Sequence, residues 1–131
     1  AGFGADGLPE DGYVLKYAPH SWLFPKMAAV VHHGGSGTTA SGMRAGVPTV
    51  VVPHQGDQGF WGRTVKNLGV GTAPIPRKKL TADKLAAAIT EATGNPAMRE
   101  RAAELGAKIA VEDGVTAASQ LVEQYLSEQY A

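Results

Sequence analysis

Residues 30–58 read VVHHGGSGTTASGMRAGVPTVVVPHQGDQ, and this stretch decides how the chain folds. An apolar run, Ala28–Val31, leads into two histidines and the small-residue loop Gly34–Gly37. A second apolar run, Thr49–Val52, leads into Pro-His-Gln-Gly-Asp-Gln at positions 53–58. Short apolar runs bounded by turn residues are typical of parallel strands that are buried on both faces. We therefore expect two neighbouring parallel strands, each followed by a helix.

Predicted strands and helices alternate along the first two thirds of the chain. The strands are expected at Tyr13–Tyr17, Ala28–His33, Val47–Pro53 and Val70–Pro74. The helices between them are expected at about Leu23–Met27, Thr38–Ala45 and Gln58–Leu68, with Ser21 as the cap of the first and with Gly46 and Gly69 just beyond the ends of the other two. This alternation favours right-handed βαβ units in an α/β fold, a Rossmann-like parallel sheet flanked by helices.

The tail after Pro76 is predicted to be helical. Thr81 is expected to cap one helix, and Asn95 is expected to cap the next, with Pro96 as its first residue. In that second helix, Leu105 and Ile109 are expected to pack against the sheet or neighbouring helices. A last helix is expected at about 115–126, where Leu121, Val122, Tyr125 and Leu126 recur at positions that can pack.

Composition limits the possible functions. The chain has 131 residues, which suits one domain, and a formal net charge of zero, so no nucleic-acid or acidic-membrane partner is implied. Cysteine is absent, which excludes disulfides and thiolate metal sites. The sequence contains no apolar run long enough to span a membrane and no secretory pattern at its N-terminus.

The glycine-rich loop after the first apolar run predicts an anion site. A strand, a tight turn and a helix leave free backbone N–H groups at the helix N-terminus. Glycines at positions 34, 35 and 37 let a phosphate approach the main chain, and hydroxyls follow at positions 36, 38 and 39. His33 can add another donor. Because neighbouring parallel strands open toward the same edge, Asp57 and Gln58 are expected beside this loop, an arrangement that suits a nucleotide sugar.

Several motifs in this order resemble a known family. His-His-Gly-Gly-Ser-Gly-Thr-Thr at 32–39, Ala-Gly-Val-Pro at 45–48 and Gly-Asp-Gln at 56–58 resemble the donor half of a GT-B-fold, UDP-sugar-dependent glycosyltransferase. Pro-His-Ser-Trp-Leu-Phe-Pro at 19–25 is similar to the sterol 3-beta-glucosyltransferase branch, with bacterial macrolide and glycopeptide glycosyltransferases as relatives. The resemblance extends from about Asp11 to the C-terminus.

The resemblance implies a role for each matching residue. His33 and the loop would contact the donor diphosphate, the Asp-Gln pair would bind sugar hydroxyls, and the backbone of Ala18 would pair with uracil beside His20. The implied donor-binding residues are Ala18, His20, His33, Gly35, Ser36, Gly37, Thr38, Asp57 and Gln58. Plant-type members have a ribose-binding glutamate at the position of Ser41, so the mode of ribose contact differs here.

The resemblance also implies a reaction. We expect residues 1–131 to form the UDP-sugar donor-binding domain of an inverting glycosyltransferase, truncated at its N-terminal side and without the acceptor domain. The full protein would transfer glucose from UDP-glucose to a sterol or another lipophilic hydroxyl. In the family the base lies in the N-terminal domain, so no catalytic residue is assigned here. We expect no cofactor and no metal, and a cytoplasmic location or a peripheral association of the full-length protein with a membrane.

Simpler interpretations remain open at several positions. Asp57 alone could be a helix N-cap, and the loop could be only a tight turn capped by Ser36. His32 and His33 cannot easily share a metal ion, because adjacent strand residues point to opposite faces; His32 is expected to be packed and hydrogen-bonded.

At the level of the whole chain, the alternative function is a catalytically inactive nucleotide-sugar-binding module that needs a partner. An uncovered sheet edge would invite self-association. A dinucleotide-binding domain lacks support, because no G-x-G-x-x-G follows the first predicted strand and no acidic residue follows the second.

Overall fold

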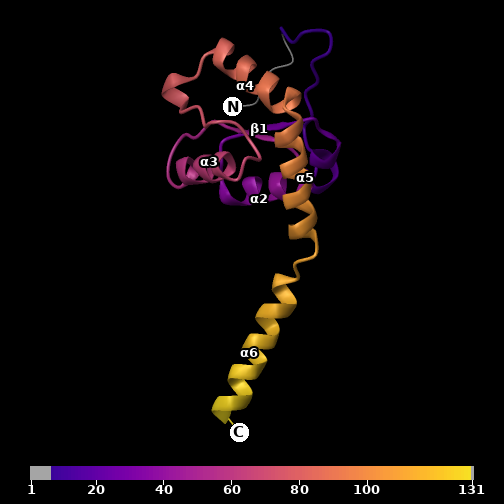
Figure 1. Ribbon diagram of the computed structural model, residues 1–131, viewed down its shortest axis with the longest axis vertical. Helices are drawn as coiled ribbons and strands as arrows, with labels where there is room; N and C mark the ends of the chain where they lie inside the picture. Colours follow the sequence, from indigo (N-terminus) through magenta and orange to yellow (C-terminus); the bar gives the residue numbers. More distant parts are fainter. Residues whose placement is uncertain (1–6, 131) are drawn as a thin grey trace.

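The computed structural model describes residues 7–130 and has a small parallel sheet at its centre (Figure 1). Strand β1 (Val30–His32) pairs in parallel with β2 (Thr49–Val51), with Val30 opposite Thr49. The helices are α1 (His20–Leu23), α2 (Ser36–Ala45), α3 (Gln58–Asn67), α4 (Ala82–Gly94), α5 (Pro96–Ala110) and α6 (Gly114–Tyr130), with short 3-10 helices η1 (Phe24–Lys26) and η2 (Arg77–Lys79). The α/β class and the order of the two central strands were predicted correctly.

Strand β2 is buried throughout because helices cover both of its faces, whereas in β1 Val30 is buried and Val31 is exposed. Val50 packs with residues of α4 and the start of α5, whereas Val51 packs with residues of α3 and α5 on the other face. Both valines are fully buried, and successive strand residues point to opposite faces. Burial on both faces explains why the strand sequence is continuously apolar.

The predicted fourth strand, Val70–Pro74, is present only in part. Thr72 N–H donates to Thr49 O at 3.1 Å, and a single parallel bridge joins Gly71 to Thr49. Farther along, Ile75 N–H donates to Val51 O at 2.9 Å. The segment therefore runs beside β2, but Pro74 has no N–H to donate, so no regular ladder forms there.

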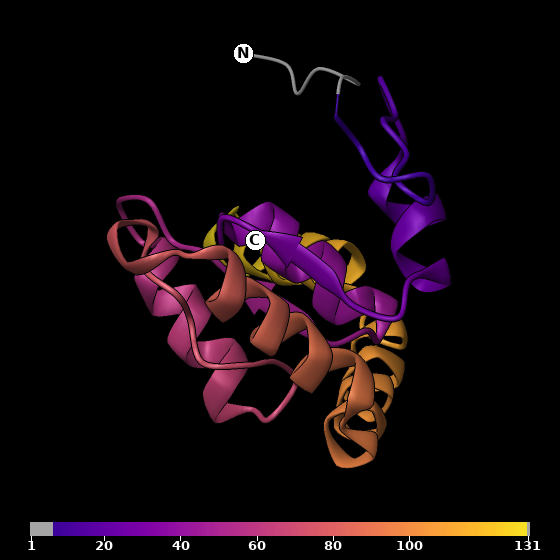
Figure 2. The ribbon, with the colours of Figure 1, turned by 90° about the horizontal axis from the view of Figure 1, so that it is seen from above.

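The prediction of a strand at Tyr13–Tyr17 is wrong. This segment is irregular, and Tyr13 and Tyr17 are 91% and 85% exposed. Figure 2 shows the N-terminal part of the described chain, in indigo, extending away from the sheet. The segment pairs with no strand among residues 7–130, so within that range β1 is an edge strand. Local sequence can favour an extended conformation, but a strand also needs a partner for its backbone.

The two helices of the tail begin at their predicted capping residues, whereas the first short helix does not. Thr81 Oγ1 accepts a hydrogen bond from Lys84 N at 3.3 Å, and Asn95 Oδ1 accepts one from Met98 N at 3.1 Å. Ser21 lies inside α1, a helix that begins at His20 after Pro19 and has no side-chain cap. Proline can precede a helix without a hydroxyl cap, so the prediction of Ser21 as the helix cap was wrong.

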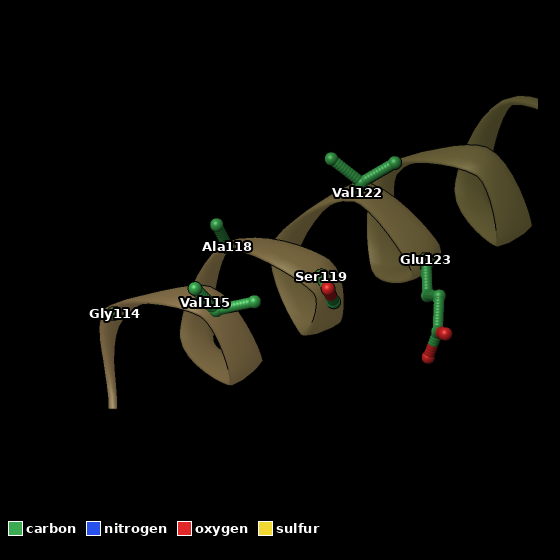
Figure 3. A pocket seen from close by; sticks show the side chains of 6 residues that line it. All are labelled: Gly114, Val115, Ala118, Ser119, Val122 and Glu123. Carbon is green, nitrogen blue, oxygen red and sulfur yellow. The ribbon is translucent and has the colours of Figure 1, made fainter.

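The C-terminal helix α6 contributes no buried residue. It extends away from the rest of the structure (Figure 1), and it is longer than the predicted helix. The side chains expected to pack are Leu121, Val122, Tyr125 and Leu126, which are all exposed. A shallow hollow of about 560 Å³ on this helix is lined only by its own residues (Figure 3), so no second element encloses it. By contrast, Leu105 on α5 packs against the Val51 cluster, as predicted.

Candidate functional site

The site begins at the junction between β1 and α2, where Gly34 makes the turn. Gly34 has a φ of +89°, and a Cβ built on it would lie 2.6 Å from Val51 Cγ1, so only glycine fits. Helix α2 starts two residues later, at Ser36, earlier than predicted. Gly35 occupies the N-cap position without a side-chain cap, so the interpretation of Ser36 as the cap is not supported.

The first turn of α2 has free backbone donors. The first helical hydrogen bond runs from Thr39 N–H to Gly35 O at 2.9 Å. Within residues 7–130, no acceptor is bonded to the N–H groups of Ser36, Gly37 and Thr38. A Cβ built on Gly37 would have no heavy atom within 4 Å, so space is open beside these donors. Free N–H groups and the helix dipole together favour an anion here.

The His33 ring lies beside the same helix end. A Cβ built on Gly35 would be 2.5 Å from His33 Nε2, so the absence of a side chain at Gly35 makes room for the imidazole. His33 is exposed, whereas its neighbour His32 is partly buried. The structure thus brings together the histidine, the glycine and the free N–H groups that were predicted to contact a diphosphate.

His32 stabilises the turn at Gly34 through a hydrogen bond. Its Nδ1 accepts the Gly34 N–H at 2.9 Å, so the hydrogen of the neutral ring is on Nε2, which is buried without a partner in the described structure. Burial, and to a lesser extent the nearby His33 and His20, lowers the pKa of His32 from 6.5 to about 4. The prediction of a packed, hydrogen-bonded histidine is confirmed for Nδ1. In the same range of residues, no group of three or more His, Cys, Asp or Glu side chains has metal-site geometry.

The junction between β2 and α3 is held by its own side chains. Gln58 Oε1 accepts hydrogen bonds from His54 N at 2.8 Å and from Gln55 N at 3.0 Å. Asp57 stands at the N-cap position of α3, but its carboxylate caps no backbone N–H and accepts instead from Trp61 Nε1 at 2.9 Å. The carboxylate and the Gln58 amide group therefore sit on an ordered loop, with Asp57 exposed to solvent.

The two junctions meet. A Cβ built on Gly34 would lie 3.0 Å from Gln58 O and 3.5 Å from Gln58 Cα. This contact confirms the expectation that the Asp57–Gln58 pair lies next to the glycine-rich loop. Donors for an anion and acceptors for hydroxyl groups are thus adjacent at one edge of the sheet, although their roles in binding stay predictions.

The third part of the candidate site lies at the start of α1. The His20 ring stacks on Phe24, with centroids 4.3 Å apart and planes 15° from parallel. His20 is also close enough to His32 to contribute to the lowered pKa of that residue. In the described part of the chain, the N–H and C=O of Ala18 form no hydrogen bond, so both are available for the predicted contact with a base.

Comparison with known proteins identifies the family of this arrangement. Residues 3–124 match the family described as erythromycin biosynthesis protein CIII-like, C-terminal domain. The chain belongs to this family. Its solved structural neighbours are GT-B glycosyltransferases, including the glycosyltransferase of kitacinnamycin, with 31% identity and a TM-score of 0.82 over 95% of this chain and 32% of that one.

Two relatives of known activity differ in the sugar that their names specify. The chain is 43% identical over 122 residues to a sterol 3-beta-glucosyltransferase of Arabidopsis thaliana, covering 93% of this chain and 20% of the relative. It is 44% identical over 118 residues to O-mycaminosyltylonolide 6-deoxyallosyltransferase of Streptomyces fradiae, covering 90% of this chain and 28% of the relative. The chain therefore spans about a fifth to somewhat over a quarter of these relatives.

Two features of the site did not emerge from the sequence analysis. Trp61 holds the Asp57 carboxylate, and Gln58 reaches back to the backbone at positions 54 and 55. The four-residue spacing between Asp57 and Trp61 on a predicted helix start could have suggested the first contact. The second depends on the path of the loop, for which the sequence carries no clear signal.

Proposed function

We propose that this chain is the donor-binding domain of an inverting UDP-sugar-dependent glycosyltransferase that transfers glucose from UDP-glucose to a sterol or another lipophilic alcohol. The observation that carries the proposal is the meeting of the two junctions. Free N–H groups of α2 and the His33 ring suit a diphosphate, and the Asp57–Gln58 loop beside them suits sugar hydroxyls.

The choice of sugar and acceptor has narrower support. The Arabidopsis relative is named as a sterol glucosyltransferase. The family resemblance of the Asp57–Gln58 pair, in which a glutamine goes with glucose in plant-type members, also favours glucose. The Streptomyces relative, at a similar identity, is named for a different sugar. Glucose and a sterol are therefore the first donor sugar and acceptor to test.

In the proposed reaction, this domain stabilises the leaving group. The acceptor oxygen forms a bond to the anomeric carbon while the bond from that carbon to the phosphate oxygen breaks, and UDP leaves with the electron pair. The hydroxyl proton goes to a base supplied by the other domain. Negative charge that develops on UDP meets the α2 N–H groups and His33, which are already oriented before the reaction starts.

A second candidate is a nucleotide-sugar-binding module that does not catalyse transfer. Two observations favour it: the groups at the site suit the donor, and no residue of this sequence matches the family's base. Both candidates predict binding of UDP and no transfer by this domain alone, so turnover by the full-length protein is the measurement that separates them.

Calorimetric titration with UDP, UDP-glucose and NAD tests the choice of ligand. We expect binding of UDP and UDP-glucose and none of NAD; binding of NAD without UDP would refute the proposal. Incubation of this chain with UDP-glucose and a sterol, followed by mass spectrometry, should give no product, because the proposed reaction takes its base and its acceptor site from the other domain. Steady glucoside formation that is lost in His33→Ala would instead place a base within this chain.

A further inference from the structure

The charges of this chain are distributed unevenly, although they sum to zero. Residues 77–84, in η2 and the start of α4, contain four cations and one carboxylate, whereas residues 109–130 contain four carboxylates and no Lys or Arg. Figure 1 shows α4 near one end of the long axis and α6 at the other end. The zero net charge therefore hides a local cationic surface. We call it the basic patch, and its members are Arg77, Lys78, Lys79 and Lys84.

The cations of the basic patch are available to an anionic partner. All four side chains are exposed. Lys84 Nζ donates to Lys79 O at 3.2 Å, and across residues 7–130 no carboxylate is hydrogen-bonded to a member of the patch. The fields of neighbouring cations add when the charges lie within about 10 Å, the Debye length at 0.1 M salt. The patch thus presents a positive potential to solvent.

The backbone holds the basic patch beside the candidate donor site. Arg77 N–H donates to Pro53 O at 3.1 Å, and Pro53 begins the loop that carries Asp57 and Gln58. Lys79 N–H donates to Pro76 O at 2.7 Å, which closes the turn of η2. A surface that binds the patch therefore lies close to the side of the site that suits sugar hydroxyls.

The patch also has an apolar component. Leu80 directly follows three of the cations and is 38% exposed. At a bilayer surface, an exposed leucine can enter the headgroup boundary while ammonium and guanidinium groups meet the lipid phosphates. Proteins that bind single-stranded nucleic acid stack bases on aromatic rings, and residues 76–84 contain no aromatic side chain. This composition favours a lipid surface over a nucleic acid.

We propose that the basic patch docks this domain on an anionic lipid bilayer, with Leu80 at the headgroup boundary and the four cations against the lipid phosphates. The choice of a bilayer rests on the proposed function, because a sterol or another lipophilic alcohol is dissolved in a membrane. Docking through the patch brings the donor site to the surface that holds the acceptor. It also keeps the carboxylates of α6 at the far end of the molecule, away from the anionic lipid.

Co-sedimentation of this chain with lipid vesicles tests the proposal. One set of vesicles contains phosphatidylcholine alone, and in the other about a third of it is replaced by phosphatidylserine, which gives a negative surface potential. We expect binding only to the second set. We also expect that binding to be lost at about 1 M salt, where the Debye length falls to about 3 Å. Equal binding to both sets, or binding to neither, would overturn the inference.

A charge-matched pair of variants tests the place of docking. The triple variant Lys78→Gln, Lys79→Gln, Lys84→Gln should bind the anionic vesicles about a hundredfold more weakly, since each cation near such a surface contributes about fivefold. The control changes the net charge equally by replacing three exposed lysines outside the patch with glutamine, and its binding should stay within about threefold. Its positions are Lys16, Lys66 and Lys108.

Two results with these variants would contradict the proposal. An equal loss in both triple variants would show that net charge, and not the basic patch, governs binding. A single-stranded RNA that bound the unmodified chain as tightly as the vesicles, and that the patch variant no longer bound, would show that the patch does not select a bilayer.

Titration with UDP separates this inference from the proposed function. The patch variant should bind UDP as the unmodified chain does, because none of its three lysines belongs to the candidate donor site. An unmodified chain that binds UDP but not the anionic vesicles would refute this inference alone. A chain that binds the vesicles but not UDP would refute the proposed function alone.

Tryptophan fluorescence tests the position of Leu80 on the bilayer. In Leu80→Trp, the added indole should move into a less polar environment when anionic vesicles are added, so its emission should shift to shorter wavelength. The unmodified chain, which has Trp22 and Trp61, supplies the baseline. A bound Leu80→Trp variant whose emission does not shift beyond this baseline would place Leu80 away from the bilayer, against the proposal.

Discussion

The junction after β1 and the junction after β2 both lead from a parallel strand into a ten-residue helix, but the side chains of the two junctions bind their backbone N–H groups differently. After β1, glycines and a histidine leave the N–H groups at positions 36–38 without a partner in the described structure. After β2, the Gln58 side chain binds two backbone N–H groups of its own loop. In the described structure, both helices begin with N–H groups that have no partner, at 36–38 in α2 and at 59 and 60 in α3. The second junction differs because the Gln58 side chain also fixes the loop that carries Asp57.

This difference shows how one fold can form two kinds of subsite at a single edge of its sheet. Free main-chain donors recognise charge and suit a phosphate, since the helix dipole adds to them. An ordered loop with an exposed carboxylate presents an acceptor at a defined place and suits hydroxyl groups. The contact between Gly34 and Gln58 makes each subsite depend on the position of the other.

The largest expected effect comes from breaking that contact. Gly34→Ala should lower the free energy of unfolding by about 2–5 kcal/mol, because a positive φ is strained for alanine and the added carbon would press on Val51 and Gln58. Urea denaturation measures the change. Gly37→Ala is the control: it has open space on α2 and should raise stability by about 0.4–1 kcal/mol. Equal stability of both variants would show that the junctions do not touch.

Removal of the His33 ring tests the anion-binding side of the comparison. His33→Ala should weaken UDP and UDP-glucose equally, by about 1.5–3 kcal/mol, the value of a charge-assisted hydrogen bond. Isothermal calorimetry gives both affinities. In the control, His54→Ala, the side chain is removed from the other junction while the bonded backbone N–H remains. If His54→Ala weakened UDP as much as His33→Ala, the phosphate would not be confined to the first junction.

Acidification should lower the free energy of unfolding through His32, which belongs to the first junction. The pKa of His32 is about 4 in the folded chain, below its ordinary 6.5, so the unfolded chain binds the proton first as the pH falls. The contribution of His32 to the free energy of unfolding is therefore fully present above pH 6.5, and it is lost as the pH falls toward 4.

Urea denaturation at several pH values measures this loss. His32→Asn, which keeps an oxygen acceptor for Gly34 N–H, should remove the histidine part of the decline. His54→Asn at the exposed loop serves as control. An identical decline in His32→Asn would assign the pH dependence to other groups.

The smallest expected effect concerns UDP binding by Asp57→Ala. We expect its affinity for UDP to stay within about 0.5 kcal/mol, as for surface substitutions, while the gain from UDP to UDP-glucose falls by about 0.5–1.5 kcal/mol. Calorimetry with UDP and with UDP-glucose measures the two affinities. The control is Asp83→Ala, at an exposed position of α4. An equal loss for both ligands would mean that Asp57 acts by shaping the start of α3.

The features that could be predicted from the sequence depend on local patterns. Continuous apolar residues predicted β1 and β2, and Thr81 and Asn95 predicted helix starts, because each signal and its effect lie within a few residues. The closeness of the glycine-rich loop to Asp57 and Gln58 could be predicted because the loops after neighbouring parallel strands lie at one edge of a sheet.

The features that were missed depend on partners distant in the chain. The residues at 13–17 are mostly apolar and aromatic, as in a strand, but they pair with no strand in the described structure. Prolines near position 75 interrupt a ladder that the apolar residues alone predict. The apolar positions of α6 have helical spacing, but spacing cannot supply a surface to cover them. Within the site, the reach of Gln58 depends on the shape of a whole loop.

The bond between Trp61 and Asp57 also gives the protein an optical signal. The indole N–H donates directly to the carboxylate that we assign to sugar hydroxyls, so a sugar that engages this carboxylate changes the polarity around the indole. The chain has two tryptophans, and the other one, Trp22, is 57% exposed on α1 beside Lys26. With Trp22 replaced by phenylalanine, fluorescence from a single indole would follow occupancy of the sugar subsite without any attached dye.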